Sequence, residues 1–360
     1  MYRTGAIVVA GNHGVLSSAT SGQGARDSEQ DCFASPLACV EVLGESVLER
    51  TVGRLRASGV KKIDVVTGPT GDLRRARNLR FRTVEDPNLL WQAAAHALQE
   101  FARRKVDAVL IAALGAYAEV DVRAAFEFHH TKAQAVTPLY DRDGALAWWI
   151  VEPARVLSVP TFSLPLAEQD MSDSPVPYFV EGYVNRLADA RDLRRLTIDA
   201  FLGRCCIAPR GREIRPGIWV GDGVRMHKTA RLVAPAFVGN NSRVQSSVVV
   251  TRFSNLERDC FIGEGSVVAN ASILPHTTIG RGLDISSALV KGSEFVDLSR
   301  NVSLLLQDPL LISSSISSGA RGSADPKQHQ HLHPNPQPEI EYSYLSRAAG
   351  RLLEVFKGEV

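Results

Sequence analysis

The chain has 360 residues, 44% of them apolar and 22% charged, and its 41 basic and 39 acidic residues leave a formal net charge of +2. That length predicts two domains, each long enough to bury a core, and the near-neutral balance gives no electrostatic footprint for nucleic acid. No stretch approaches the roughly 18 apolar residues of a membrane span, and the N-terminal apolar run is too short for a signal peptide. Five cysteines without a C-x-x-C pair argue against a disulfide framework and a zinc site, so we expect a cytoplasmic protein with no metal site.

The first half of the chain alternates strand-like and helix-like segments. A continuous apolar run at 5–11 and two further strand-like segments at 61–67 and 107–113 predict three strands. Helical spacing of apolar residues predicts three helices, at 46–58, 89–101 and 122–130. This alternation predicts a Rossmann-like α/β domain with a mostly parallel sheet over residues 1–204. Ligands of such sheets bind beyond the carboxyl ends of the strands, here at 11–35, after Thr67 and at 114–120.

The second half repeats with a period of six. From Val220 onward an apolar residue recurs at every sixth position: Val220, Met226, Leu232, Val238, Val244, Val250, Leu256, Ile262, Val268 and Leu274. A small or β-branched residue follows each of them four positions later. Period six matches neither a helix nor an alternating strand, but it is typical of a parallel β-helix, in which each hexapeptide forms one flat face of a triangular coil. We predict this β-helix over 214–298, with the register slipping by one residue at Ile279.

The composition changes again after the repeats. Residues 313–339 are rich in Ser, His and Pro with little to bury, which predicts a disordered linker. Residues 340–357 recover amphipathic spacing and predict a helix that docks on this protein or a partner, with a membrane surface as the alternative. The histidines of the linker and the pair His129–His130 are expected to bind metal only adventitiously.

Residues 35–68, SPLACVEVLGESVLERTVGRLRASGVKKIDVVTG, combine a Pro-Leu start, a helix and a strand. This segment resembles the K-P-L-L-P-V-x-G-K-P-L-L-E-R-x-L segment of the sugar-nucleotide pyrophosphorylases, or NDP-sugar nucleotidyltransferases. An α/β domain followed by hexapeptide repeats is most similar to the mannose-1-phosphate guanylyltransferase type, whose β-helix is left-handed. The resemblance implies attack of a sugar 1-phosphate on the α-phosphate of a nucleoside triphosphate, with carboxylates that hold Mg²⁺ and cations at the phosphates.

The loops that carry this chemistry in the family differ here. The family's G-x-G-T-R phosphate loop is similar to residues 11–16, which lack the arginine, and Ser35 replaces the lysine before Pro-Leu. The base-contacting G-T-A-G resembles residues 91–94, where bulk replaces the close backbone approach that glycine allows. The sugar-contacting N-A-G resembles Ala145-Leu146-Ala147.

The two metal aspartates of the family are also replaced. The aspartate of V-L-V-x-x-G-D falls on Ala116, and that of G-Y-W-x-D-I-G-T falls on Arg186. A cation at Arg186 would repel Mg²⁺, and losing one charge-stabilising group typically costs ~10²–10³ in rate. Together the replacements predict a site that no longer performs the family's reaction and needs no cofactor.

The first functional hypothesis is therefore a non-catalytic or regulatory relative. It would resemble the regulatory α-subunit type of GDP-mannose pyrophosphorylase, or the nucleotidyltransferase-like subunits of a eukaryotic translation initiation exchange factor. Such a protein would bind a nucleotide sugar through Gly11, Asn12, Gly14 and Gln92, within sugar-nucleotide supply for polysaccharide or glycoconjugate synthesis. Because solenoid ends need covering, it would form a homo-oligomer or pair with an active relative through the β-helix.

Two alternatives remain. An active nucleotidyltransferase with rearranged ligands would use Arg26 at the phosphates and Glu119 or Asp121 on Mg²⁺. Acyl transfer is the other, since hexapeptide β-helices also carry acyltransferases that use a histidine base between coils. His227 and His276 lie in the repeats and are the candidates, although this hypothesis leaves the N-terminal domain unexplained.

Overall fold

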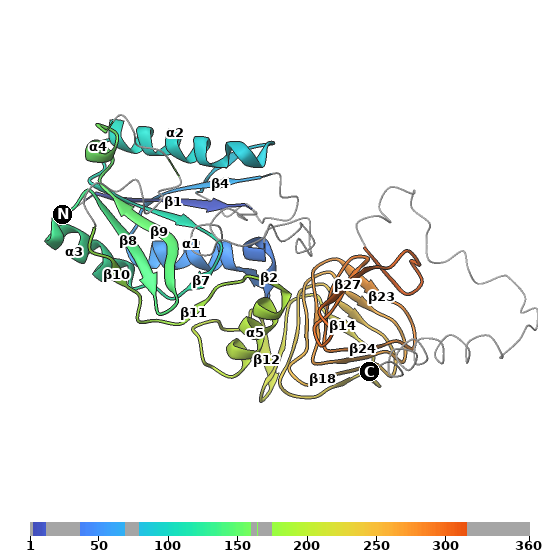
Figure 1. Cartoon of the computed structure of the whole chain (residues 1–360). Coiled ribbons are helices and arrows are strands. Elements are labelled where there is room, and N and C mark those ends of the chain that lie inside the picture. Colours follow the sequence, from blue (N-terminus) through green and yellow to red (C-terminus); the bar gives the residue numbers. More distant parts are fainter. Residues whose placement is uncertain (1–2, 12–36, 69–78, 160–163, 165–174, 315–360) are drawn as a thin grey trace, which may run out of the picture. The chain divides into compact units, whose positions relative to one another are not determined.

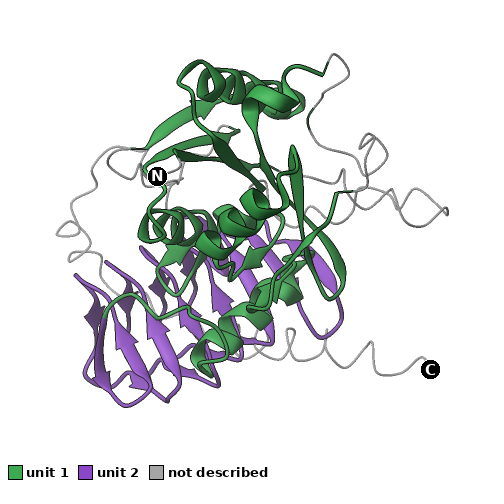
Figure 2. Cartoon of the chain, turned by 90° about the vertical axis from the view of Figure 1, so that its left-hand side faces the viewer, with its two compact units in different colours: residues 1–211 green, residues 212–360 purple. Residues whose placement is uncertain are grey.

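The computed structural model describes residues 3–11, 37–68, 79–159, 164 and 175–314 (Figure 1). The chain divides into two compact units between Gly211 and Arg212 (Figure 2). The predicted linker starts two residues too early, because residues 313 and 314 still belong to a strand that is paired in the second unit. The rest of that linker and the predicted helix 340–357 lie outside the described residues.

The first unit is built on a seven-stranded sheet of order β10-β8-β9-β6-β1-β4-β5. Strands β6, β1, β4 and β5 are parallel, whereas β9 runs antiparallel to both β6 and β8. The strands of this unit are β1 (Thr4–Ala10), β2 (Glu41–Val42), β3 (Glu45–Ser46), β4 (Lys62–Thr67), β5 (Arg80–Thr83), β6 (Ala108–Ala113), β7 (Tyr117–Ala118), β8 (Val136–Asp141), β9 (Gly144–Val151), β10 (Tyr178–Phe179) and β11 (Val184–Asn185). The parallel core confirms the predicted mixed α/β domain, and the β8–β9 hairpin was not predicted.

Helices cover both sides of this sheet, with α2 on one side and α1 and α3 on the other (Figure 1). The helices are η1 (Leu37–Cys39), α1 (Val47–Ala57), η2 (Pro87–Leu89), α2 (Leu90–Arg103), α3 (Val122–Lys132), α4 (Pro153–Val156) and α5 (Ala190–Phe201). Helix α1 begins at a capping box in which Ser46 and Glu49 satisfy each other's backbone N–H groups, and it ends before Gly59. The three predicted helices are confirmed as α1, α2 and α3, with ends within two residues of the expected ones.

The second unit consists of three sheets through which the chain passes in rotation. Its strands are β12 (Arg212–Arg215), β13 (Ile218–Val220), β14 (Arg225–Met226), β15 (Arg231–Leu232), β16 (Ala236–Val238), β17 (Arg243–Val244), β18 (Val249–Thr251), β19 (Asn255–Leu256), β20 (Phe261–Ile262), β21 (Val267–Ala269), β22 (Ser272–Ile273), β23 (Thr277–Ile279), β24 (Asp284–Ser286), β25 (Ala288–Lys291), β26 (Glu294–Asp297), β27 (Val302–Leu305) and β28 (Ile312–Ser314). From β13 to β22 each strand pairs in parallel with the third strand after it. This pairing is compatible with a parallel β-helix of three strands per coil.

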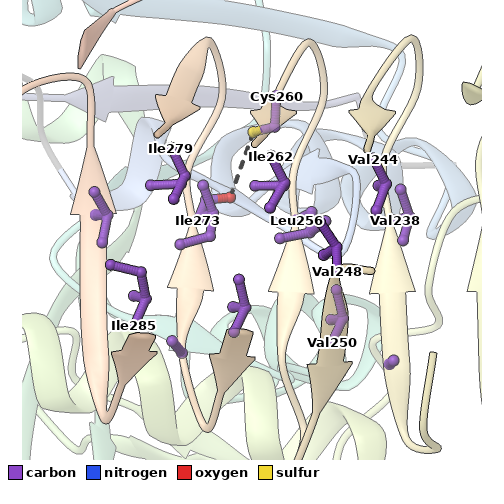
Figure 3. Close-up of a cluster of buried hydrophobic side chains, with 14 of the residues drawn as sticks. Val238, Val244, Val248, Val250, Leu256, Cys260, Ile262, Ile273, Ile279 and Ile285 are labelled. Carbon is purple, nitrogen blue, oxygen red and sulfur yellow. Dashed lines mark hydrogen bonds between the residues drawn. The ribbon is translucent and has the colours of Figure 1, made fainter. Parts of the chain in front are cut away.

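The interior of this unit is filled by most of the apolar residues of the six-residue pattern, and those labelled in Figure 3 point toward one another. Met226, which the pattern also places inside, is 39% exposed. Paired residues are 18 apart in the early coils, as in Ile218 and Ala236, and 17 apart from Asn255 and Ser272 onward. The predicted slip at Ile279 therefore comes one strand too late. Ile273, rather than Leu274, joins the interior cluster opposite Leu256. Because Ile273 and Leu274 are both apolar, the sequence pattern is compatible with either residue pointing inward.

Small residues at the coil corners form hydrogen bonds as well as fitting a narrow space. The buried hydroxyl of Ser266 donates to the Gly280 carbonyl at 2.7 Å and accepts from the Leu283 N–H at 3.1 Å. Ser242, at a different corner of an earlier coil, bridges to Glu257 and Cys260 in the same way. Each corner serine thus satisfies two backbone groups of the next coil that would otherwise be buried without partners.

Replacing a corner serine tests this bridging. Ser266→Ala leaves the Gly280 carbonyl and the Leu283 N–H without their side-chain partner, so it is expected to cost about 1–3 kcal/mol of unfolding free energy. Denaturant unfolding followed by circular dichroism measures the change. Ser286→Ala, at an exposed position of β24, is the matched control and should remain within about 0.5 kcal/mol of the parent chain. Equal effects of the two variants would refute the bridging role.

A buried histidine makes the first unit sensitive to acid. His129 of α3 shares a hydrogen bond of 2.7 Å with Thr137, while its buried Nε2 has no hydrogen-bond partner within the described ranges. Burial lowers the pKa of His129 from 6.5 to about 4, so the folded state holds it neutral while the unfolded chain takes up a proton. Stability is therefore full above pH 6.5 and is lost as pH falls toward 4, by at most about 3 kcal/mol.

His129→Gln should flatten the dependence of the melting temperature on pH between 6.5 and 4. His96→Gln, at an exposed position of α2, is the matched control and should flatten the slope less than His129→Gln does. Melting curves at half-unit pH steps compare the three proteins. An unchanged slope in His129→Gln would contradict the assignment.

Candidate functional site

Two segments that the sequence analysis singled out separately lie side by side. Strand β7 pairs antiparallel with β11, with Val184 opposite Ala118 and Asn185 opposite Tyr117. The Glu119 N–H also donates to the Tyr183 carbonyl at 2.8 Å. Gly182 permits this contact, because a Cβ at that position would overlap the carbonyl oxygen of Glu119. The chain just before β11 therefore approaches the backbone of Glu119 so closely that only glycine fits at position 182.

Continuing this register by one residue places Arg186 opposite Ala116. These are the two positions at which the resemblance implies metal aspartates. The Arg186 guanidinium binds the β8–β9 hairpin: it pairs with the Asp141 carboxylate and donates to the carbonyls of Ala145 at 2.9 Å and Gly144 at 3.1 Å. Asp141 is only 8% exposed, so the arginine neutralises a carboxylate that would otherwise be buried and unpaired.

The hairpin that receives Arg186 carries a backbone irregularity. The pairing of β8 with β9 shifts between Leu139 and Tyr140, and Leu146 and Ala147 fall in the shift. Ala147 has φ +55°, in the left-handed region that favours glycine. It occupies the third position of the segment compared with N-A-G, whose glycine this conformation would suit.

The residues present do not fit the Mg²⁺ ion that the resemblance implies. A methyl group at Ala116 and a guanidinium at Arg186 offer no oxygen ligand, and the guanidinium repels a cation. Over the described part of the chain, no group of three or more His, Cys, Asp or Glu side chains is placed to hold a metal ion.

Glu119, a metal ligand under the active hypothesis, is bound to three protein donors through one oxygen. Its Oε1 accepts from the Tyr117 hydroxyl at 2.8 Å and from the Cys206 N–H, and it lies 3.6 Å from Arg54. Arg54, from α1, also donates to the Ala118 carbonyl at 2.9 Å. This cluster fastens α1 and the chain around Cys206 to β7, so the structure gives Glu119 a packing role.

The phenol and thiol groups around this cluster are held in their protonated forms. Burial raises the pKa of the Tyr117 hydroxyl, and also that of Tyr183, which donates to Asp199 at 2.7 Å. Burial raises the pKa of the Cys205 thiol to about 11. The pKa of Cys206 is raised mainly by a hydrogen bond to Glu119 and, as a second cause, by burial. Neither thiol is ionised near neutral pH, so these cysteines lack the thiolate that nucleophilic chemistry needs.

The other sequence-predicted residues are spread over the first unit. Asp121 caps α3, where its Oδ1 accepts from the Ala124 N–H at 3.0 Å. Gln92 is exposed on α2, and Gly11 is buried directly after β1. Asn12, Gly14 and Arg26 lie outside the described residues. Glu119 and Asp121 are thus close in sequence, but their side chains have different structural partners.

One polar atom at the carboxyl edge of the sheet was not predicted as a site residue. Thr67 is the last residue of β4, opposite Ala10 of β1, and among the residues that the structure describes its buried hydroxyl has no hydrogen-bond partner. Buried hydroxyls are normally satisfied, and the carboxyl edge is where ligands of parallel sheets bind. In the sequence, the only indication of this residue as a site candidate was its position at the end of an apolar strand segment.

The histidines of the acyl-transfer hypothesis both have local partners. His276 Nε2 lies 2.7 Å from Arg258 Nη1, and its Nδ1 lies 3.6 Å from Asp259. His276 has φ +60°, a turn conformation that Asn241 and Asp259 adopt at equivalent positions of earlier coils. His227 Nδ1 lies 2.8 Å from the Thr229 hydroxyl. Both ring nitrogens of His276 thus face charged side chains, Nε2 a cation and Nδ1 a carboxylate.

These features fit an α/β nucleotidyltransferase-like unit with an arginine where the resemblance implies a metal aspartate. No protein-family model matches the chain. Over 88 residues it is 30% identical to a UTP–glucose-1-phosphate uridylyltransferase from Synechocystis sp., a stretch that covers 24% of this chain and 23% of the relative's length. The match thus spans less than a quarter of that protein, and it supports a distant relationship to sugar nucleotidyltransferases. Within the described residues, no helix combines the length and apolarity needed to cross a bilayer.

Gly182→Ala tests the crossing of β7 and β11. The added methyl meets backbone atoms of Glu119, which no side-chain rotation can relieve, so we expect a loss of about 2–3 kcal/mol or more. Gly53→Ala, in the middle of α1 with open space around it, is the matched control and should stabilise by about 0.5–1 kcal/mol. Thermal and urea unfolding of both variants give the values. A neutral Gly182→Ala variant would rule out the close contact.

Proposed function

We propose that this protein is a non-catalytic sugar-nucleotide-binding relative of the sugar nucleotidyltransferases, acting in sugar-nucleotide supply for polysaccharide or glycoconjugate synthesis. The proposal takes the second unit as a left-handed β-helix of hexapeptide repeats. Self-association, or pairing with an active relative through that β-helix, and a cytoplasmic location remain expectations that belong to the same proposal.

One observation carries the proposal: the position opposite Ala116 holds a cation already paired with Asp141. Phosphoryl-type transfer depends on positioned charge at the phosphates, and a divalent ion supplies most of that charge in such sites. A fixed guanidinium can still attract a diphosphate, but it does not polarise an attacked phosphorus as a divalent ion does. Binding without turnover is the behaviour that this replacement favours.

Further support comes from the carboxyl edge of the sheet. The unsatisfied hydroxyl of Thr67 offers a hydrogen bond next to the end of β1, which precedes the segment compared with the family's phosphate loop. The relative's name, a uridylyltransferase acting on glucose 1-phosphate, makes a uridine nucleotide sugar the first ligand to test. The guanosine nucleotide sugar follows from the resemblance to the mannose-1-phosphate guanylyltransferase type.

A thermal-shift panel of UDP-, GDP-, dTDP- and ADP-sugars tests the proposal alongside a pyrophosphate-release assay with each nucleoside triphosphate, its sugar 1-phosphate and Mg²⁺. At least one nucleotide sugar should raise the melting temperature, by an amount equivalent to about 2.7 kcal/mol at 100 times its Kd. No pyrophosphate should be released.

Three results would contradict the proposal. Absence of a shift with every nucleotide sugar would remove the binding function. Pyrophosphate release that is lost in Glu119→Ala or Asp121→Ala would establish the active alternative with Mg²⁺. Acetyl-coenzyme A consumption that is lost in His276→Ala would establish the acyltransferase alternative.

A further inference from the structure

Arg186 still has hydrogen-bonding capacity after its contacts with the hairpin are counted. A guanidinium has five N–H groups, and three of them are directed to Asp141, Gly144 and Ala145. Among the described residues the Nε–H has no hydrogen-bond partner, but its nitrogen is buried too deeply for an outside ligand to reach. The contacts with the hairpin use only one of the two Nη1–H groups, and the side chain is 36% exposed. An anion that accepts from the second Nη1–H would form a charge-assisted hydrogen bond.

The surroundings of the guanidinium favour an anion over a cation. Ala116, opposite Arg186 in the β7–β11 register, contributes no charge and little volume. Asp141 holds the guanidinium from the hairpin and also accepts from the Asp143 N–H at 2.9 Å. Arginine is the side chain best suited to phosphate oxygens, because its planar fork donates in pairs.

The local charge sum explains how such a site works without a metal ion. Two aspartates and a divalent cation sum to zero, and so do Arg186 and Asp141. The ion pair therefore supplies a positioned cation that is present as soon as the chain folds. We infer that this protein binds the diphosphate of a nucleotide sugar through Arg186 and independently of divalent metal. The inference rests on the proposed function, since it assigns the ligand that the proposed site would hold.

Isothermal titration calorimetry of the full chain with UDP-glucose, or with the nucleotide sugar that gives the largest thermal shift, tests the inference. The Kd in EDTA should agree within about twofold with the Kd in Mg²⁺. Arg186→Gln should weaken binding at least about tenfold, the range for a hydrogen bond to a charged group. Arg142→Gln, an exposed arginine in the turn of the same hairpin, is the matched control and should leave the Kd unchanged.

Asp141→Asn separates a binding role from a structural one. Removing the counter-charge leaves the guanidinium more positive, so a binding role predicts equal or tighter binding in Asp141→Asn. If the ion pair only held the hairpin in place, Asp141→Asn and Arg186→Gln would weaken binding to the same degree. The double variant carrying both substitutions removes both charges and avoids an unpaired buried carboxylate. It should also bind weakly while melting within a few degrees of the parent chain.

The outcomes distinguish this inference from the proposed function. Binding that requires Mg²⁺, or that is unaffected by Arg186→Gln, overturns the inference and leaves the nucleotide-sugar function standing. Absence of binding by every nucleotide sugar, in EDTA and in Mg²⁺, overturns both. Metal-independent binding that is lost only when Arg186 is changed supports both.

Discussion

The pairing of β7 with β11 is the contact on which the arrangement of the candidate site depends. Its register, continued by one residue beyond the paired strands, sets residues 116 and 186 opposite each other although they are distant in sequence. The contact is anchored from several sides, because Arg54 of α1 holds β7 and Tyr183, beside β11, donates to Asp199 of α5. With the backbone fixed in this way, the chemistry of the crossing is decided by which side chains occupy the two positions.

An arginine at that crossing changes how the site is assembled. Two carboxylates placed opposite each other repel, so such a pair is favourable only with a cation bound between them or with one group protonated. Arg186 removes this requirement, because it neutralises Asp141 within the chain itself. The desolvation of the pair is partly offset by the backbone carbonyls of Gly144 and Ala145, which accept from two further N–H groups of Arg186. The charges of the site are therefore balanced as soon as the chain folds, but the site has no metal ion to act as a Lewis acid.

The sequence predicts those parts of the fold that depend on local spacing. Helix α1 follows from its apolar spacing between Ser46 and Gly59, and the interior of the second unit follows from the six-residue period. The slip at Ile273 could not be placed, because Leu274 fits the same apolar pattern and only strand pairing distinguishes them. Likewise, Arg186 was identified as a replacement, but its partner Asp141 lies on a hairpin that sequence spacing did not reveal.

Acidic residues near strand ends show the same division between local and distant causes. Asp121 is followed three residues later by the N–H that it caps, a pattern visible in sequence. Glu119 has its partners on α1 and near Cys206, so sequence inspection could not separate a metal ligand from an ion-pair residue. Moving Glu119 to a metal would leave the buried hydroxyl of Tyr117, the Cys206 N–H and Arg54 without their shared acceptor. Because unsatisfied buried groups are costly, the packing that holds β7 in place opposes the use of Glu119 in catalysis.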